Sequence, residues 1–351
     1  MTPLTAVWAV PAFTRGEVDR AGRLLAQNGV VADPLVIGHA LDVINNWRSS
    51  HSFPLNTFQM TLRNRAASIC DDPIVARRLK RVPSIFAKLR RFPTMKLSQM
   101  QDIGGARAVL PSLAEVDALR DLYRPRMKHR FAGEKDYVRR PKTSGYRSIH
   151  LVYRYGSDRK ETYNGLHIEL QLRTRRQHAW ATAVETVGTF LGQSLKSSEG
   201  RADWLRFFEL VGSGFATAEG APAGPNVPES TTSLVAEIRE AAQRLQVKQK
   251  LEAFSRVLVV TEVHREKLRG RNYLLLLVLR PEHESLEVRT YGRSGLPAAT
   301  ADYLMEEKRL AGTAGDTVLV ASDSLDSLRQ AFPNYFFDTR TFREELDQLL
   351  A

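Results

Sequence analysis

The stretch LHIELQLRT, from Leu166 to Thr174, alternates cleanly between apolar and polar residues. Successive side chains of a β-strand point to opposite faces of its sheet. The aliphatic side chains of this stretch therefore face one way, and the other face carries His167, Glu169, Gln171 and Arg173. The apolar face indicates a sheet packed on a core. The polar face is either a solvated outer surface or a row that binds a divalent cation or accepts a proton, and other segments have to decide.

Two further segments predict strands beside it, DIGGARAVL (Asp102 to Leu110) and SIHLVYRY (Ser148 to Tyr155), with a helix from Leu113 to Leu122 between them. Asp102 precedes a Gly-Gly pair, where a ligand can approach the backbone closely. Carboxylates on two strands, Asp102 and Glu169, suit a Mg²⁺ ion shared with substrate phosphates. The sequence has no GK dipeptide and no GxGxxG, so side chains would have to hold the phosphates.

The stretch PKTSGYRSIH, from Pro141 to His150, places several donor-bearing or aromatic side chains around one glycine: Lys142, Tyr146, Arg147, Ser148 and His150. If the backbone from Tyr146 to His150 is extended, these two side chains share a face and lie roughly 13 Å apart, enough to span a base and its phosphate end. The cluster therefore predicts an acceptor-nucleotide site. The alternatives are a tyrosine packed in a hairpin with surface cations and, for His150 alone, a histidine satisfied within the core.

The charge balance favours anionic partners. The chain has 51 Lys and Arg against 39 Asp and Glu, a formal net charge of +12. From Val75 to Lys96 it holds eight basic residues and no acidic one, which is too one-sided for a salt-bridged helix face. Nucleotides, nucleic acid or an acidic membrane face would match this charge, although a basic but uninvolved surface gives the same composition.

The compartment follows from what the sequence does not contain. The single cysteine, Cys70, permits no internal disulfide, and neither CxxC nor HExxH indicates a zinc site. The longest strongly apolar run, YLLLLVL from Tyr273, is far shorter than the ~20 residues that span a bilayer. The N-terminus lacks the basic region of an export signal. We expect a cytoplasmic protein with no membrane span.

The length of 351 residues fits two domains. Apolar spacing predicts helices over Thr14–Gln27, Pro34–Trp47, Leu55–Cys70 with a continuation after Pro73, and Gln177–Phe190. A stretch rich in Gly, Ala and Pro predicts a linker at 212–230, between domains at 1–211 and 231–351. Beyond it we expect helices over 232–254, 302–309 and 342–350, with strands at VLVVTEV, NYLLLLVLR, SLEVRTY and TVLVASD.

Four motifs in order make residues 77–185 resemble the RelA/SpoT-type nucleotide pyrophosphokinases, which make the alarmones guanosine tetra- and pentaphosphate. The first is R-x-K-x-x-x-S-x-x-x-K, at Arg78, Lys80, Ser84 and Lys88. The others are DIGGAR (102–107), DYVRRPKTSGYRSIH (136–150) and IELQLRT (168–174). The resemblance implies an α+β fold, in which a nucleotidyltransferase-like mixed sheet flanked by helices precedes a smaller C-terminal α+β domain. It also implies transfer of the β,γ-pyrophosphate of ATP to a ribose 3′-hydroxyl, with release of AMP.

The resemblance assigns roles by position. Arg78 and Arg107 would sandwich the adenine, and Lys80 and Lys88 would hold the ATP phosphates, with Ser84 in the same motif. Asp102 and Glu169 would bind Mg²⁺; Glu169 would also activate the 3′-hydroxyl, with support from Gln171. Tyr146 would stack on the acceptor base, while Lys142, Arg147 and His150 would face acceptor phosphates. Such chemistry depends on positioning and charge neutralisation, which agrees with a site rich in cations.

The ends of the chain resemble one branch of the family, the CapRel-like fused toxin-antitoxin proteins. The segments VDRAGRLLAQ and FPNYFFDTRTF carry this resemblance, and no HD dipeptide indicates a hydrolase half. In that branch a C-terminal Tyr-x-x-Tyr element covers the adenine site, and Phe332 and Tyr335 stand at the corresponding positions here. We expect them to dock near Arg78 and Arg107 and to stack on the guanidinium groups; the alternative is plain domain core. In the family this domain sometimes senses a phage protein.

Three hypotheses remain for the partner of this site. The CapRel-like branch implies the 3′-CCA end of tRNA as acceptor, and the arginines outside the motifs favour that acceptor because phosphate contacts dominate RNA affinity. If the acceptor is GDP or GTP, a compact cationic pocket would be enough to bind it. The third hypothesis is a non-catalytic RNA-binding module. The two carboxylates argue against it, because a protein that only binds RNA gains nothing from negative charges that face phosphates. The basic candidates for tRNA contact are Arg124, Arg126, Lys128, Arg130, Arg139, Arg140, Arg175 and Arg176.

Overall fold

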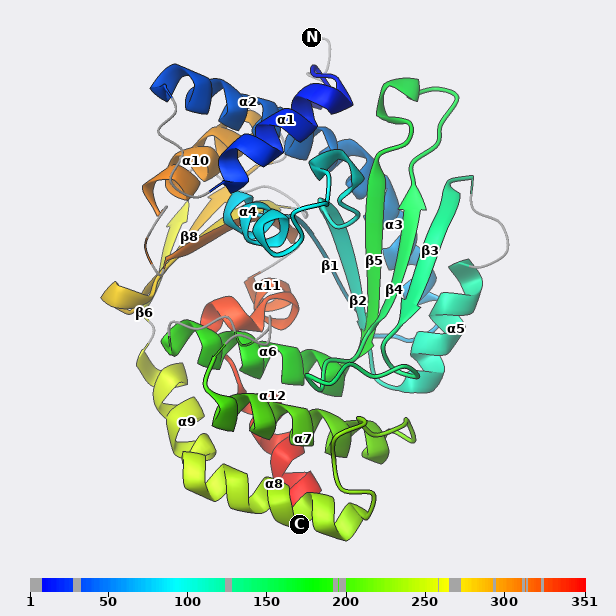
Figure 1. Ribbon diagram of the computed structural model, residues 1–351, viewed down its shortest axis with the longest axis vertical. Helices are drawn as coiled ribbons and strands as arrows, with labels where there is room; N and C mark the ends of the chain where they lie inside the picture. Colours follow the sequence, from blue (N-terminus) through cyan, green and yellow to red (C-terminus); the bar gives the residue numbers. More distant parts are fainter. Residues whose placement is uncertain are drawn as a thin grey trace.

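The computed structural model describes residues 8–27, 33–123, 128–191, 195, 200–257, 259–264, 273–292, 295–310, 313, 315–322 and 325–351. Within this part the chain forms the expected α+β structure, with a larger mixed sheet, a smaller mixed sheet and a helical body below both in Figure 1. No helix in the described part is long and apolar enough to span a membrane.

The larger sheet has five strands in the order β1-β2-β5-β4-β3. Strands β2 and β5 run parallel and the other neighbours antiparallel. The bounds are β1 Ile74–Leu79, β2 Gly104–Leu110, β3 Arg130–Asp136, β4 Ile149–Arg154 and β5 His167–Thr174. The three predicted strands thus lie side by side at the centre of the sheet, and two strands at its edges, β1 and β3, were not predicted.

Helices pack around this sheet and bury its apolar side chains. Helices α3 and α5 contact β2 and β5, and α1 lies against α2 and α4. Local signals set two of the starts: Thr14 and Glu17 form a capping box at α1, and Asp33 caps α2. The bounds are α1 Arg15–Ala26, α2 Pro34–Ser50, α3 Ser52–Ala67, α4 Val82–Arg91 and α5 Leu113–Tyr123.

The expected helical continuation after Pro73 is wrong, because β1 occupies Ile74–Leu79 and pairs with β2 throughout. Its sequence IVARRL contains two adjacent arginines and shows no simple alternation. Pairing with a neighbouring strand, which local sequence does not report, decides its structure. The basic helix α4 begins only at Val82, so Arg78 and Lys80 belong to the strand and to the turn that follows it.

The helical body contains α6 Arg175–Phe190, α7 Ala202–Ala218, α8 Thr231–Leu245, α9 Val247–Val257 and α12 Arg340–Leu350. The predicted linker at 212–230 begins too early, because α7 continues to Ala218 and buries residues 212–216. The predicted helix over 232–254 is two helices, divided at Gln246 in the left-handed conformation (φ 52°). Side chains from α6, α7, α8 and α12 share one apolar cluster.

The smaller sheet has the order β6-β8-β7-β9. Its bounds are β6 Val259–His264, β7 Tyr273–Arg280, β8 Ser285–Tyr291 and β9 Asp316–Ser322, with helices α10 Leu296–Arg309 and α11 Leu325–Ala331 beside it. Strand β9 lies against β1 of the larger sheet. Ala76 of β1 accordingly joins the apolar cluster that holds Val318, Phe332 and Tyr335.

Two glycines attach the loop before β4 to the helical body. Gly145 has φ +82°, and a Cβ atom there would lie 2.5 Å from the carbonyl oxygen of Phe208. A Cβ on Gly212 would lie 2.4 Å from the carbonyl oxygen of Gly145. Any side chain at either position would push α7 away from this loop, so the close approach requires glycine.

Candidate active site

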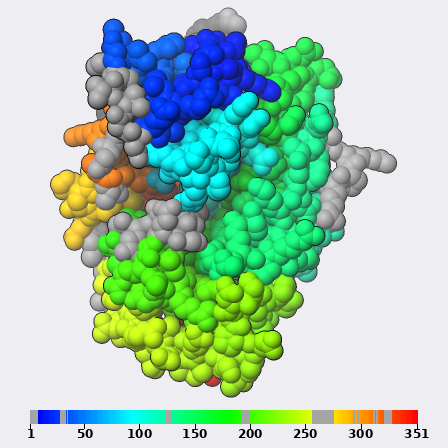
Figure 2. Space-filling model, viewed as in Figure 1, coloured from blue at the N-terminus to red at the C-terminus, as the bar shows by residue number. Residues whose placement is uncertain are grey.

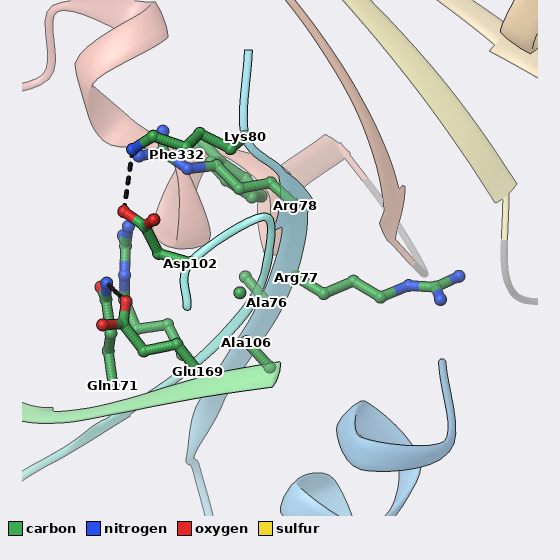
Figure 3. Close-up of a pocket in the computed structure, with 11 residues that line it drawn as sticks. Ala76, Arg77, Arg78, Lys80, Asp102, Ala106, Glu169, Gln171 and Phe332 are labelled. Carbon is green, nitrogen blue, oxygen red and sulfur yellow. Dashed lines mark hydrogen bonds and ion pairs between the residues drawn. The ribbon is translucent and has the colours of Figure 1, made fainter. Parts of the chain in front are cut away.

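A pocket of about 450 Å³, including its open mouth, lies where β1, β2 and β5 run side by side. The register places Gly105 opposite both Arg78 and Glu169, and Arg107 opposite both Ala76 and Gln171. Gly105 lines the pocket and leaves it open, because it has no side chain. The polar or aromatic residues that line the pocket are Arg77, Arg78, Lys80, Asp102, Arg107, Glu169, Gln171 and Phe332. Figure 3 shows the Arg77 side chain directed away from Asp102 and Glu169.

Asp102 is held between two lysines. Lys80 Nζ lies 2.8 Å from Asp102 Oδ2, and Lys88 Nζ lies 3.0 Å from Oδ1. Burial opposes ionisation of this carboxyl, but the two ammonium groups outweigh it and hold the pKa of Asp102 well below its ordinary value. Ser84 stands one helical turn before Lys88 on α4 and is half-buried. Figure 2 shows α4 in cyan, between the N-terminal helices in blue and the strands in green.

Both oxygens of Glu169 accept hydrogen bonds. Gln171 Nε2 donates to Oε2 at 2.7 Å, and His150 Nδ1 lies 3.0 Å from Oε1. Burial alone would raise the pKa of Glu169, but His150 more than offsets it and the pKa is lowered. Burial likewise opposes the charge on His150, yet Tyr146 and Glu169 together raise its pKa to about 9. The pocket therefore presents an ionised carboxylate in a fixed orientation.

The expected 13 Å separation of Tyr146 and His150 is wrong. The Tyr146 hydroxyl lies 2.9 Å from His150 Nε2, because β4 begins only at Ile149 and the chain before it turns. Tyr137 packs edge-on against both rings, and Lys142 Nζ lies 4.2 Å from the centre of the Tyr137 ring. Tyr137 received no role from the sequence, although it stands inside the motif DYVRRPKTSGYRSIH and its aromatic ring was a usable signal.

Arg147 does not face the pocket, which corrects its expected contact with acceptor phosphates. Its side chain is only 3% exposed and points into the helical body. Nη1 donates to the carbonyl oxygens of Tyr146 (3.3 Å) and Lys142 (3.5 Å), and Nη2 to that of Pro222 (3.5 Å). Arg147 thus fastens the loop before β4 to the segment that follows α7.

Phe332 and Tyr335 lie beside the pocket, but neither stacks on Arg78 or Arg107 in the contacts of the described residues. Phe332 lines the pocket, and Arg107 Nη1 reaches the carbonyl oxygen of Ala331 at 3.5 Å. Tyr335 is fully buried, and its hydroxyl donates to Asp316 Oδ2 at 2.9 Å. Asp316 in turn pairs with Arg81, the residue after Lys80. Asp316, which was not predicted, therefore links Tyr335 to the segment that carries Lys80.

Several basic candidates for tRNA contact are already paired with carboxylates. Arg124 and Arg126 lie outside the described residues, and Arg130 and Arg140 are exposed. The ion pairs are Lys128–Asp158 at 2.7 Å, Arg139–Asp136 at 2.9 Å, Arg175–Asp72 at 2.9 Å and Arg176–Glu345 at 2.5 Å. An RNA phosphate would have to compete with these carboxylates.

The donor set fits a magnesium ion that is shared with a substrate. Asp102 and Glu169 are both ionised and both line the pocket. No group of three or more His, Cys, Asp or Glu side chains in the described part could form a closed metal cage. Mg²⁺ usually takes one or two protein carboxylates and completes its shell with water and substrate phosphates, so this pair is sufficient.

A mixed sheet with two carboxylates and several cations around one pocket is the arrangement expected of a phosphoryl-type transferase. Residues 77–187 match the family model described as the region found in RelA / SpoT proteins. The chain therefore contains a RelA/SpoT-type region, as the four motifs indicated. That region covers less than half of the chain, and the comparisons below concern this part.

Two curated relatives are GTP pyrophosphokinases of Bacillus subtilis strain 168. YjbM is 33% identical over 110 residues, which are 31% of this chain and 52% of YjbM. YwaC is 27% identical over 110 residues, which are 30% of this chain and 52% of YwaC. The chain thus spans about half the length of these relatives. A solved structure, the small alarmone synthetase 1 of Bacillus subtilis bound to its product pppGpp, is 22% identical with a TM-score of 0.43, covering 48% of this chain and 89% of that one.

Proposed function

We propose that the chain is an ATP-dependent pyrophosphokinase that transfers the β,γ-pyrophosphate of ATP to a ribose 3′-hydroxyl. One observation carries the proposal: Asp102 and Glu169 share a pocket with the cations Arg78, Lys80 and Arg107. The names of the two relatives agree with it. The acceptor 3′-oxygen forms a bond to the β-phosphorus of ATP, the bond from that phosphorus to the α,β-bridging oxygen breaks, and AMP leaves.

The chain's own residues divide this work between positioning and proton transfer. The half-buried guanidinium of Arg107 and that of Arg78 would stack on the two faces of a planar adenine. Burial, and then Arg173 and Arg78, lower the pKa of Arg107 to about 9. Lys80 and Lys88 exchange Asp102 for the ATP phosphates. Glu169 takes the proton of the 3′-hydroxyl. A magnesium ion held by Asp102 and Glu169 would neutralise phosphate charge.

The central test replaces Glu169 with Gln, which keeps the shape of the side chain and removes its charge. We expect AMP formation to fall by at least about 100-fold, because a general base contributes 10²–10⁴-fold. Chromatographic measurement of AMP release, with thermal unfolding as a check of the fold, decides the matter. Near-normal AMP release from a folded Glu169→Gln protein would contradict the assignment.

For the acceptor, we place a guanosine nucleotide, GDP or GTP, before the 3′-CCA end of tRNA that the sequence favoured. Four of the six described basic candidates are ion-paired, which weakens the case for an extended RNA surface. The aromatic and cationic cluster of Tyr137, Lys142 and Tyr146 suits one base with its phosphates. Incubation with γ-labelled ATP and either GDP, GTP or bulk tRNA separates the cases. Label in tRNA but not in guanosine nucleotides would restore the tRNA acceptor.

We also propose that the C-terminal region restrains the enzyme, as in a fused toxin-antitoxin protein of phage defence, with a phage protein as a candidate trigger. Phe332 occupies one wall of the pocket at 3% exposure, where it narrows the space for adenine beside Arg107. Phe332→Ala should therefore increase ATP turnover and, upon expression in cells, growth inhibition. The exposed aromatic Phe131 provides a control as Phe131→Ala. Equal turnover of wild type and Phe332→Ala would show that Phe332 does not restrain the site.

A further inference from the structure

Arg173 lies behind the residues that hold Glu169. It follows Glu169 and Gln171 on the polar face of β5 and is only 3% exposed. Its Nη2 donates to Gln171 Oε1 at 2.9 Å, and Gln171 Nε2 donates to Glu169 Oε2 at 2.7 Å. The three side chains form a directional chain of hydrogen bonds that ends at the carboxylate.

Arg173 and Glu169 together set the direction of this chain. The Gln171 amide has an accepting oxygen and a donating nitrogen that can exchange places by rotation. Arginine only donates and an ionised carboxylate only accepts, so both favour the orientation in which the amide oxygen faces Arg173 and the NH₂ group faces Glu169. Without Arg173, only the bond to Glu169 would hold the amide, and the Gln171 side chain would be free to change its rotamer.

Arg173 also contacts the second support of Glu169. Its guanidinium carbon lies 5.9 Å from the centre of the Tyr146 ring. Tyr146 holds His150 at 2.9 Å, and His150 holds the other Glu169 oxygen at 3.0 Å. The Arg173 guanidinium therefore contacts both sets of residues that hold the Glu169 carboxylate, Gln171 on one side and Tyr146 with His150 on the other.

The surroundings of Arg173 do not stabilise its charge, so the residue contributes little to the stability of the fold. In the part of the chain that the structure describes, no Asp or Glu forms an ion pair with Arg173, and its Nε is buried without a hydrogen-bond acceptor. Arg107 lies nearby and adds positive charge. Burial, Arg107 and Arg173 hold the pKa of neighbouring His178 well below its ordinary value, so that ring stays neutral and supplies no compensating negative charge. A buried cation with a neutral acceptor destabilises a fold relative to an apolar side chain of similar size. We therefore look for the role of Arg173 in the candidate active site and not in the stability of the fold.

We infer that Arg173 is a positioning residue, which acts through Gln171 to fix the orientation of the Glu169 carboxylate toward the acceptor hydroxyl. This inference rests on the proposed pyrophosphokinase function. It differs from substrate binding, because Arg173 is placed to touch Gln171 and the Tyr146 ring rather than the reacting atoms. A positioning residue changes the rate of the bound complex more than it changes substrate affinity.

The test is a double-mutant cycle of Arg173→Met and Gln171→Met in the full chain, assayed by ATP-dependent pyrophosphate transfer. Arg173→Met should lower kcat by about 10- to 100-fold, the usual range for a residue that orients a catalytic group, with less than about a 2-fold change in KM for ATP. In the Gln171→Met background, the same replacement should lower kcat by less than about 2-fold, since the route is already broken. Arg244→Met, on the exposed face of α8, is the matched control.

Stability gives a second and independent readout. Arg173→Met should unfold at the same temperature as wild type or a higher one, because a poorly paired buried cation is removed. If Arg173→Met fails to fold, Arg173→Lys keeps one donor toward Gln171 and should retain more activity than Arg173→Gln. Multiplicative losses in the cycle, or a rise in KM at unchanged kcat, would overturn the inference.

The failure of the inference can be told from the failure of the proposed function. Transfer by wild type that Arg173→Met leaves unchanged would overturn the inference alone. If neither wild type nor Phe332→Ala transfers pyrophosphate to GDP, GTP or tRNA, the proposed function fails, and the catalytic role of Arg173 fails with it.

Discussion

Tyr146 and Arg147 are neighbours in the sequence, but their polar groups have different partners. Tyr146 contacts His150 in the site, while Arg147 bonds carbonyl oxygens at the helical body. Both types of side chain are common at nucleotide sites, so residue type alone placed them together. The chain turns at Gly145, with φ +82°, immediately before these two residues, so a regular strand pattern could not place them.

We therefore expect Arg147→Met to act on stability rather than on catalysis. In the described part of the chain, Arg173 has one acceptor, on its own strand, whereas Arg147 joins two chain segments, and its loss leaves three carbonyl oxygens without this donor. The change should therefore lower the free energy of unfolding by about 1–3 kcal/mol. KM for the acceptor should stay within about 2-fold of wild type, since no contact with the pocket is lost. Denaturant unfolding and steady-state kinetics check the two parts, and a large rise in acceptor KM without loss of stability would return Arg147 to the site.

The candidate-site residues that could be predicted are those that stand in or next to a recognisable strand. Asp102, Glu169 and Gln171 stand in clean strand motifs, and the structure brings them to one pocket. Asp316 and Glu307 could not be predicted, because their partners Arg81 and Arg48 lie more than 200 positions away in the sequence. A single sequence carries no direct signal for such contacts.

At the scale of elements, α4 receives its N-terminal cap from a distant helix. The Val82 backbone N–H donates to Glu307 Oε1 of α10 at 2.8 Å, and no side chain at the N-cap position of α4 supplies this bond. Glu307 Oε2 also pairs with Arg48 at 3.0 Å, and the Tyr303 hydroxyl donates to Oε1 at 2.9 Å. A carboxylate at a helix N-terminus is stabilised by the free N–H groups and the helix dipole.

Glu307→Gln should loosen α4, which carries Lys88. Arg48 is buried and would lose its charged partner, so we expect a loss of up to about 3 kcal/mol in unfolding free energy. Hydrogen exchange over residues 82–91 measures the helix, and Glu240→Gln on α8 provides an exposed control. Unchanged exchange in α4 would contradict the capping role.

The local sequence pattern predicted which strands and helices exist better than it predicted where they begin and end. Strands β2, β4 and β5 were predicted because each has one apolar face, while β1 pairs along its whole length with a partner that its own arginines do not reveal. The early linker prediction at 212 failed for a related reason. Glycines in α7 reflect close packing against Gly145 and Ile238, not freedom of the chain.

At the scale of the whole molecule, the C-terminal region is built into the helical body. Phe342 and Leu346 of α12 share a buried cluster with Phe207 and Val184, and α8 packs along α7. The chain therefore crosses from the body to the smaller sheet and returns to the body. The proposed restraint is part of the core rather than an appendage on a linker.

This arrangement changes what truncation measures. Removal of residues after Val227 would expose the apolar faces of α6 and α7, and we expect a protein that aggregates or unfolds at least about 10 °C lower, since several large buried side chains are lost together. Circular dichroism and size-exclusion chromatography check this. A truncated protein that is monomeric and as stable as wild type would show that the two regions fold separately, and growth inhibition could then be read from it directly.

The same return of α12 to the helical body has a genetic consequence. A premature stop codon in the second half of the chain removes α12, which is part of the core that the first half needs. The product would be a substrate for proteases and not an enzyme freed from its restraint. Under the restraint proposed above, only a change that spares the helical body would release the activity.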